Sequence, residues 1–185
     1  TAEMYPVPPK ADTFTRTESI IGTWLKRQPR DKVILASKVS GGNRKLEWIR
    51  GGPTAVDRDN VRSAIEGSLK RLQTDYLDLY QIHWPERNVP IFGQYQFDPS
   101  KEKQWVSIQT QLEVLAELVQ EGKVRYIGVS NEQPWGVMEF LRVAKDGATL
   151  PTSSFTSPAG VGATIGDQLD DTRLWRQFHD GATLV

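Results

Sequence analysis

The sequence TDYLDLYQIHWP, residues 74–85, has the pattern of one buried β-strand that ends at a histidine. Successive side chains of a strand point to opposite faces, so alternate residues form two sets. One set contains Leu77, Leu79, Gln81 and His83. The other set contains Asp78, Tyr80, Ile82 and Trp84. Both sets are largely apolar, which is typical of a parallel strand covered on both faces. Pro85 cannot continue a hydrogen-bonded ladder, so it ends the strand. His83 is therefore predicted at the carboxyl end of a parallel strand, where α/β folds place their chemistry.

Two other segments share this arrangement of an apolar run followed by polar residues. Val33–Lys38 (VILASK) ends in a lysine, and Val124–Asn131 (VRYIGVSN) ends in Ser130 and Asn131. Each residue taken alone also has a structural interpretation, since His83 fits a partly buried histidine and Lys38 fits a lysine that reaches solvent. Because the carboxyl ends of adjacent parallel strands form one rim, we expect Lys38, His83 and Asn131 to lie together there.

Amphipathic helices are predicted after each of these strands and also before the first. They cover about residues 17–27, 57–72 with Asp57 as N-cap, 105–121, and from Pro134 onward. The repeated strand–helix order predicts parallel βαβ units. The first two strand-to-helix connections, 39–56 and 84–104, are long and lie on the side of the predicted rim, which is where function is expected. Tyr5 would join this side if another strand ended just before Thr1.

Composition narrows the classes of function. The 185 residues carry 23 Lys and Arg against 23 Asp and Glu, so the charge balance favours neither nucleic acid nor an anionic membrane as partner. The absence of cysteine excludes disulfides and thiolate metal sites, and it fits a reducing compartment, so we expect a cytoplasmic protein. No apolar run approaches the roughly 18 residues of a membrane span. The chain begins at Thr1 and not at methionine, and we expect it to be part of a longer protein.

The chain divides at about residue 148. Residues 1–148 contain the strand–helix pattern, whereas residues 149–185 are rich in Ser, Thr and Gly and show no clear helical or strand period before about residue 167. We expect an atypical tail over 149–185, whose role the pattern leaves open.

Four segments in order resemble the aldo-keto reductase superfamily, in particular the branch that is similar to potassium channel β-subunits. They are TAEMYPVPP at the amino terminus, ILASKVSG, LKRLQTDYLDLYQIHWP and GKVRYIGVSNEQPWGVM. The resemblance implies a (β/α)8 barrel of TIM type that binds NADP(H) and reduces a small carbonyl substrate, an aldehyde or ketone. With three clear βα units, the barrel is expected to be incomplete.

The resemblance also implies roles for individual residues. Tyr5 is similar to the general acid of the family, Lys38 to the cation that lowers the pKa of the tyrosine, and His83 to the residue that orients the carbonyl oxygen. Ser130 and Asn131 resemble the pair that holds the nicotinamide carboxamide. A late segment, GATIGDQL at 162–169, is similar to the cofactor-phosphate segment of the family, which implies contacts from Gly162, Thr164 and Gln168.

One departure bears on activity. The family's catalytic aspartate stands immediately before the TAEMY motif, a position that falls one residue before Thr1, and no residue nearby in the sequence replaces it. We expect the chain as given to be a poor catalyst. Two alternatives to an enzyme stay open, namely a cofactor-binding regulatory protein with a protein partner, like the channel β-subunits, and an inactive truncated relative.

Overall fold

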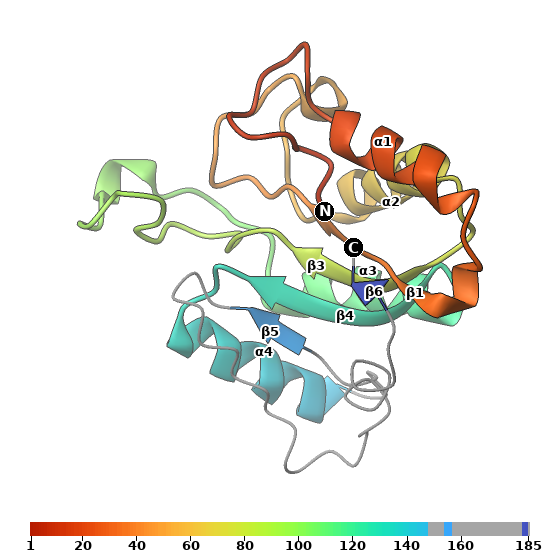
Figure 1. The fold of residues 1–185 in the computed structure, drawn as a ribbon. Coiled ribbons are helices and arrows are strands. Elements are labelled where there is room, and N and C mark those ends of the chain that lie inside the picture. Colours follow the sequence, from red (N-terminus) through yellow and green to blue (C-terminus); the bar gives the residue numbers. More distant parts are fainter. Residues whose placement is uncertain (148–153, 157–182, 185) are drawn as a thin grey trace.

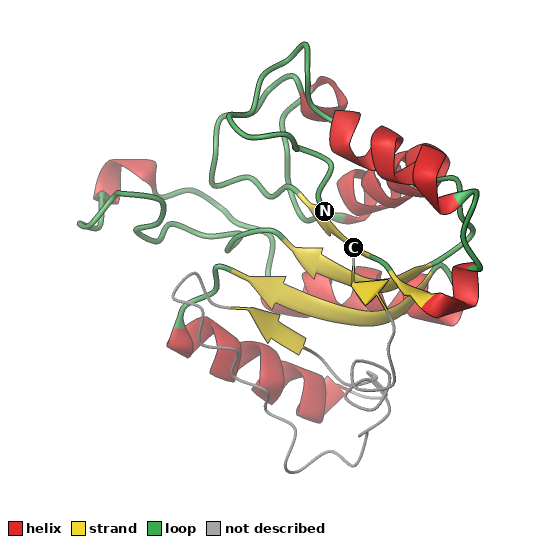
Figure 2. Ribbon diagram, in the orientation of Figure 1, coloured by secondary structure: helices red, strands yellow, loops and turns green. Residues whose placement is uncertain are grey.

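A computed structural model of the protein describes residues 1–147, 154–156 and 183–184. In these residues, strands and helices alternate along the chain, as the sequence predicts (Figure 2). No helix in this part of the chain is long and apolar enough to cross a membrane. The predicted cofactor residues Gly162, Thr164 and Gln168 lie outside the described residues.

One four-stranded parallel sheet forms the centre of the molecule, in the strand order β2, β3, β4, β5 (Figure 1). The strands span Ala36–Val39, Leu77–Ile82, Val124–Ser130 and Ser154–Thr156. The register places Lys38 beside Gln81, and Gln81 beside Gly128. A second, two-stranded parallel pair joins β1 (Val33–Ile34) to β6 (Thr183–Leu184).

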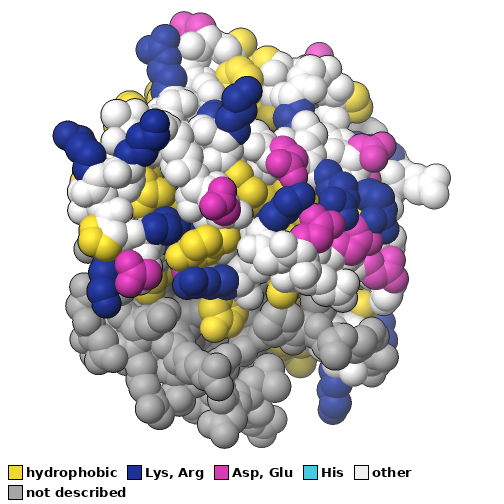
Figure 3. Space-filling model, turned by 90° about the vertical axis from the view of Figure 1, so that its right-hand side faces the viewer, with side chains coloured by type: hydrophobic (Ala, Val, Ile, Leu, Met, Phe, Trp, Pro, Cys, Tyr) yellow, Lys and Arg dark blue, Asp and Glu magenta, His cyan; other side chains and the backbone are white. Residues whose placement is uncertain are grey.

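Four α-helices accompany the sheet: α1 (Arg16–Leu25), α2 (Arg58–Leu72), α3 (Ile108–Gln120) and α4 (Pro134–Gly147). Short 3-10 helices are η1 (Arg30–Lys32), η2 (Ile49–Gly51) and η3 (Pro99–Lys101). Helix α1 packs on α2, and α3 packs on both α4 and β4. On one face of the molecule, Lys and Arg side chains lie beside Asp and Glu side chains, in keeping with the zero formal net charge (Figure 3).

Helix starts follow the capping residues. Asp57 caps α2 as predicted, because its side chain accepts a hydrogen bond from the backbone nitrogen of Asn60. Pro134 occupies the first position of α4, also as predicted. The predicted start of α3 near Trp105 was three residues early, because Ser107 accepts from the backbone nitrogen of Thr110 and so begins the helix at Ile108.

The predicted strand Val33–Lys38 is interrupted at Leu35. There the backbone nitrogen donates to the Asp78 side chain at 2.9 Å, and the carbonyl accepts from the backbone nitrogens of both Asp78 and Leu79. A side-chain carboxylate therefore replaces a ladder partner at this point. The chain changes from β1 to β2 across this residue.

The tail contributes a strand that the sequence pattern did not reveal. Ser154–Thr156 forms β5, which pairs in parallel with β4 and extends the sheet beyond the three predicted strands. Three residues are too few to display the two-residue alternation from which strands are recognised. Tertiary pairing with β4 therefore determines this strand.

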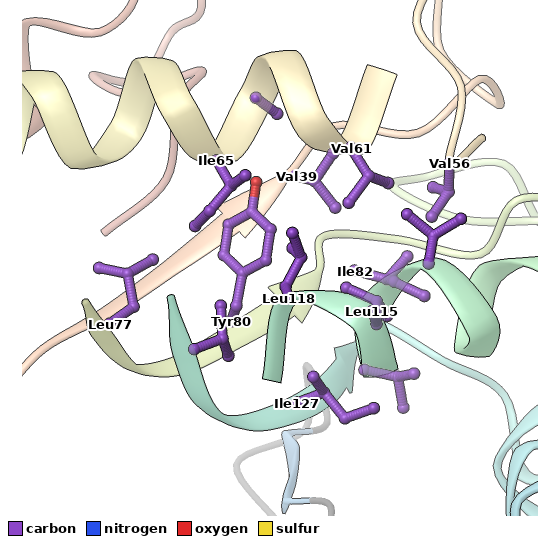
Figure 4. Packing of buried hydrophobic residues seen from close by; sticks show 14 of the residues in the cluster. Val39, Val56, Val61, Ile65, Leu77, Tyr80, Ile82, Leu115, Leu118 and Ile127 are labelled. Atoms are coloured by element: carbon purple, nitrogen blue, oxygen red, sulfur yellow. The ribbon is translucent and has the colours of Figure 1, made fainter. Parts of the chain in front are cut away.

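Two apolar clusters hold the elements together. The larger one joins the sheet to the helices, and Figure 4 shows Tyr80 in it, with its hydroxyl pointing toward α2. Burial raises the pKa of Tyr80 well above its ordinary value, so the phenol stays neutral. The smaller cluster lies at the carboxyl rim of the sheet and contains Ala2, Met4, Leu46, Ile49 and Trp84. It anchors the amino-terminal segment to the loops that follow β2 and β3.

Candidate active site

The three predicted strand-end residues lie on one rim of the sheet. Lys38 is in β2, His83 follows β3 directly, and Asn131 follows β4 directly. These strands are parallel neighbours in that order. The backbone nitrogen of His83 donates to the carbonyl of Val39 at 3.0 Å, which holds the ends of β2 and β3 side by side. The prediction that these residues share one rim is confirmed.

Tyr5 reaches the same rim from the amino-terminal segment. Ala2 and Met4 are buried in the smaller apolar cluster, and their burial holds residues 1–5 against the carboxyl end of the sheet. The Tyr5 ring meets the His83 ring edge-on, with centroids 5.5 Å apart and an interplanar angle of 82°. The Lys38 Nζ atom lies 5.6 Å from the centroid of the Tyr5 ring. A phenol, an ammonium and an imidazole therefore converge at this point.

Lys38 and His83 have no carboxylate partner among the described residues. Lys38 Nζ donates to the carbonyl of Thr1 at 2.9 Å, and it forms no ion pair with any carboxylate in the described ranges. Burial lowers the pKa of Lys38. Burial also lowers the pKa of His83 to about 3, with further contributions from the charges of Lys38 and Arg44. His83 is therefore neutral near pH 7, and its buried Nδ1 atom has no hydrogen-bond partner among the described atoms.

Glu3 lies near this site but does not serve Lys38. Its carboxylate accepts from the backbone nitrogen of Ser40 at 2.7 Å and forms an ion pair with Arg50. With both interactions made, Glu3 fixes the loop after β2 instead of pairing with the lysine.

Ser130 and Asn131 form a polar corner at the end of β4. Asn131 has φ 57°, a left-handed conformation that asparagine tolerates better than most residues. Its Nδ2 atom donates to the His83 carbonyl at 2.7 Å and to Ser130 Oγ at 3.1 Å. The amide therefore joins the end of β4 to the backbone of His83 at the end of β3.

Two residues of the rim were missed by the sequence analysis. Arg44, in the loop after β2, places its guanidinium carbon 5.0 Å from the centroid of the Trp84 ring. Glu86 is buried, and its carboxylate accepts from the backbone nitrogen of Gly42. Both residues lie in long loops that lack the periodicity on which the predictions relied, so no sequence pattern indicated either of them.

A family model and several curated proteins match most of this chain. The model of the Aldo/keto reductase family matches residues 1–154. The protein named Protein tas from Escherichia coli is 50% identical over 144 residues, which are 77% of this chain and 42% of that protein. Aldo-keto reductase YhdN from Bacillus subtilis is 39% identical over 120 residues, 64% of this chain and 30% of that protein. The chain therefore spans less than half the length of these curated relatives.

Solved structures are similar to the same part of the chain. An aldo-keto reductase from Klebsiella pneumoniae in complex with NADPH has a TM-score of 0.54 and 32% identity, over 82% of this chain and 40% of that one. An aldo/keto reductase from the same organism with NADP and acetate has a TM-score of 0.53 and 31% identity, over 78% of this chain and 38% of that one. The parallel sheet with its helices confirms the predicted fold class, an incomplete α/β barrel of TIM type.

Proposed function

We propose, because this chain belongs to the aldo/keto reductase family, that it carries the acid–base half of an NADPH-dependent carbonyl reductase. The proposed reaction converts an aldehyde or ketone to an alcohol. The observation that supports it best is the convergence of Tyr5, Lys38 and His83 at the carboxyl rim of the sheet.

Each of the three side chains has a part in this reaction. The Tyr5 hydroxyl donates a proton to the carbonyl oxygen, and the positive charge of Lys38 favours the phenolate that results. His83, neutral over the working pH range, donates a hydrogen bond to the same oxygen from the ring nitrogen opposite Nδ1. Two donors that converge on one oxygen stabilise the negative charge that develops there. When bound, NADPH supplies the hydride for the carbonyl carbon.

The residues at the end of β4 fit a nicotinamide carboxamide. Ser130 and Asn131 provide a hydroxyl and an amide that the left-handed turn at Asn131 holds in place beside His83. Such a pair can both donate to and accept from a carboxamide, and so select the ring face that meets the substrate. The two Klebsiella proteins with NADP and NADPH support the choice of NADP(H). The contacts proposed for Gly162, Thr164 and Gln168 rest on the sequence resemblance alone.

The test combines cofactor binding with turnover. NADPH and NADH are titrated against the 185-residue chain by cofactor fluorescence, and consumption of NADPH is then followed with benzaldehyde present. We expect NADPH to bind more tightly than NADH, and turnover to be slow but measurable. Binding without turnover would favour a cofactor-binding regulatory protein, and equal affinity for the two cofactors would count against the proposed cofactor.

A further inference from the structure

Arg44 is a cation of the rim that the proposed reaction does not use. Its guanidinium carbon lies 5.0 Å from the Trp84 ring centroid and 4.8 Å from that of Phe92. Trp84 follows His83 in the chain, and their ring centroids are 4.7 Å apart. The Arg44 charge also contributes to the lowered pKa of His83, after burial and the charge of Lys38. The Trp84 ring therefore contacts both Arg44 and His83, the residue at which the carbonyl oxygen is proposed to bind.

Arg44 differs from comparable arginines in lacking a carboxylate. In the described part of the chain, the other half-buried arginines each form an ion pair with Asp or Glu, namely Arg30, Arg50, Arg62, Arg71 and Arg87. The contacts of Arg44 are the two aromatic rings and Met4 Sδ, 4.0 Å from Nη1. Burial lowers its pKa. This guanidinium has lost part of its hydration without gaining an anion among the described residues, so the N–H groups that do not face Met4 are available to a ligand.

The loops on both sides hold Arg44 in this position. Trp84 Nε1 donates to the carbonyl of Gly41 at 3.2 Å, and Glu86 accepts from the backbone nitrogen of Gly42. A Cβ atom at Gly42 would come within 2.8 Å of the backbone carbonyl oxygen of Thr54, so this close approach requires glycine. On the other side, Phe92 has φ 53°, an unfavourable conformation for a large side chain. Its ring meets Trp84 edge-on at 6.2 Å.

We infer that Arg44 binds a carboxylate on the carbonyl substrate, and that Trp84 and Phe92 flank the aryl or apolar body between the carboxylate and the reacting carbonyl. A planar guanidinium matches a carboxylate in a two-hydrogen-bond pair. One arginine balances one negative charge, which favours a monoanion over a phosphate dianion. The inference rests on the proposed function, because it places the reacting carbonyl at Tyr5 and His83.

The test compares two ligands that differ in one charge. Isothermal titration calorimetry at pH 7 measures the binding of 4-formylbenzoate and of its neutral methyl ester to the 185-residue chain. The variants are Arg44→Met and Lys45→Met. Lys45 is the exposed next residue of the same loop, so its loss removes an equal charge without touching the aromatic rings. Urea unfolding midpoints confirm that both variants fold.

We expect the acid to bind about 10- to 100-fold more tightly than the ester, the range for a hydrogen bond to a charged group. Arg44→Met should abolish this preference, whereas Lys45→Met should retain both the preference and the binding of the ester. Equal binding of acid and ester, no measurable binding of the acid, or a preference that survives Arg44→Met would each overturn the inference. A loss of NADPH affinity in Arg44→Met, with acid binding intact, would instead assign Arg44 to the cofactor phosphate and also overturn it.

A second experiment separates the failure of the carboxylate site from the failure of the proposed reductase function. The same variants and Tyr5→Phe are assayed for NADPH consumption with each ligand. If Arg44-dependent acid binding is seen but no variant or parent turns over, the proposed reductase function fails and the carboxylate site stands. If both ligands turn over at equal kcat/KM in the parent chain, the function stands and the carboxylate site fails.

Discussion

At the amino end of the sheet, Asp78 has a partner for each of its oxygens, whereas at the carboxyl end Lys38, Arg44 and His83 lack comparable partners among the described residues. Asp78 pairs with Arg30 and Arg125, both at 2.8 Å, and also accepts from the Leu35 backbone nitrogen. The two guanidiniums lie over the ring of Tyr76, 3.8 and 4.2 Å from its centroid.

The difference separates a group of residues that stabilises the fold from one that is available to ligands. A buried carboxylate whose hydrogen bonds are all made strengthens the local structure. Half-buried cations that lack a carboxylate partner, and a buried imidazole nitrogen without a hydrogen bond, reduce stability, and they persist where a ligand can satisfy them. The contrast predicts that substitutions at the two ends will affect different measurements.

The largest expected effect is on catalysis at the carboxyl end. Tyr5→Phe removes only the hydroxyl, so turnover of benzaldehyde with NADPH should fall by about 10²- to 10⁴-fold, the usual range for a general acid. The urea midpoint should stay within error of the parent. Tyr95→Phe is the matched control, since Tyr95 is 92% exposed. A Tyr5→Phe chain that reduces the aldehyde at the parent rate would rule out Tyr5 as the proton donor.

The next effect is on stability at the amino end. Asp78→Ala leaves two guanidiniums and the Leu35 backbone nitrogen without their shared acceptor, so the free energy of unfolding should fall by about 3 kcal/mol. Asp75→Ala, at an exposed position three residues earlier, should change it by less than about 0.5 kcal/mol. Urea denaturation measures both. Similar losses in the two variants would show that the Asp78 interactions contribute nothing particular to the fold.

An effect of intermediate size is expected on the pH dependence of stability, through the titration of His83. Its pKa of about 3 in the folded chain lies below the ordinary value of 6.5, so the unfolded chain binds the extra proton between those two pH values. The contribution of neutral His83 to stability is complete above about pH 6.5 and is lost as the pH falls toward 3. NMR should show its ring signals unchanged down to about pH 4. In His83→Gln, unfolding free energy should fall less steeply over this range, and identical slopes would contradict the assignment.

The smallest expected effect on stability concerns Tyr76, whose ring contacts both Arg30 and Arg125. Tyr76→Leu keeps an apolar side chain but removes both cation–π contacts, so the free energy of unfolding should fall by about 1 kcal/mol. Tyr76→Phe keeps an aromatic ring and should retain most of the stability that the cation–π contacts contribute. If Leu and Phe variants unfold at the same urea concentration, the stacking of Arg30 and Arg125 on this ring adds no stability.

Much of the site could be located from sequence because its position depends on local pattern. The apolar runs before Lys38, His83 and Asn131 identified strand ends, and parallel connection then required those ends to lie at one rim. Tyr5 was different, since only the family resemblance indicated its role, and its contact with His83 depends on the burial of Ala2 and Met4. The roles of Ser130 and Asn131 stay predictions.

The sequence by itself determined the order of strands and helices, the capping by Asp57 and the rim on which the polar residues lie. Periodicity and capping act over three or four residues, so they can be recognised in a single chain. Four features were decided only by the tertiary structure. They are the break in the strand at Leu35, the ion pairs of Asp78 with Arg30 and Arg125, the short strand β5, and the contacts of Arg44 with Trp84 and Phe92. Apart from β5, whose three residues pair with β4, these features join residues about forty or more positions apart. The depressed pKa of His83 likewise reflects loss of water, which depends on everything packed around the ring and on no local motif.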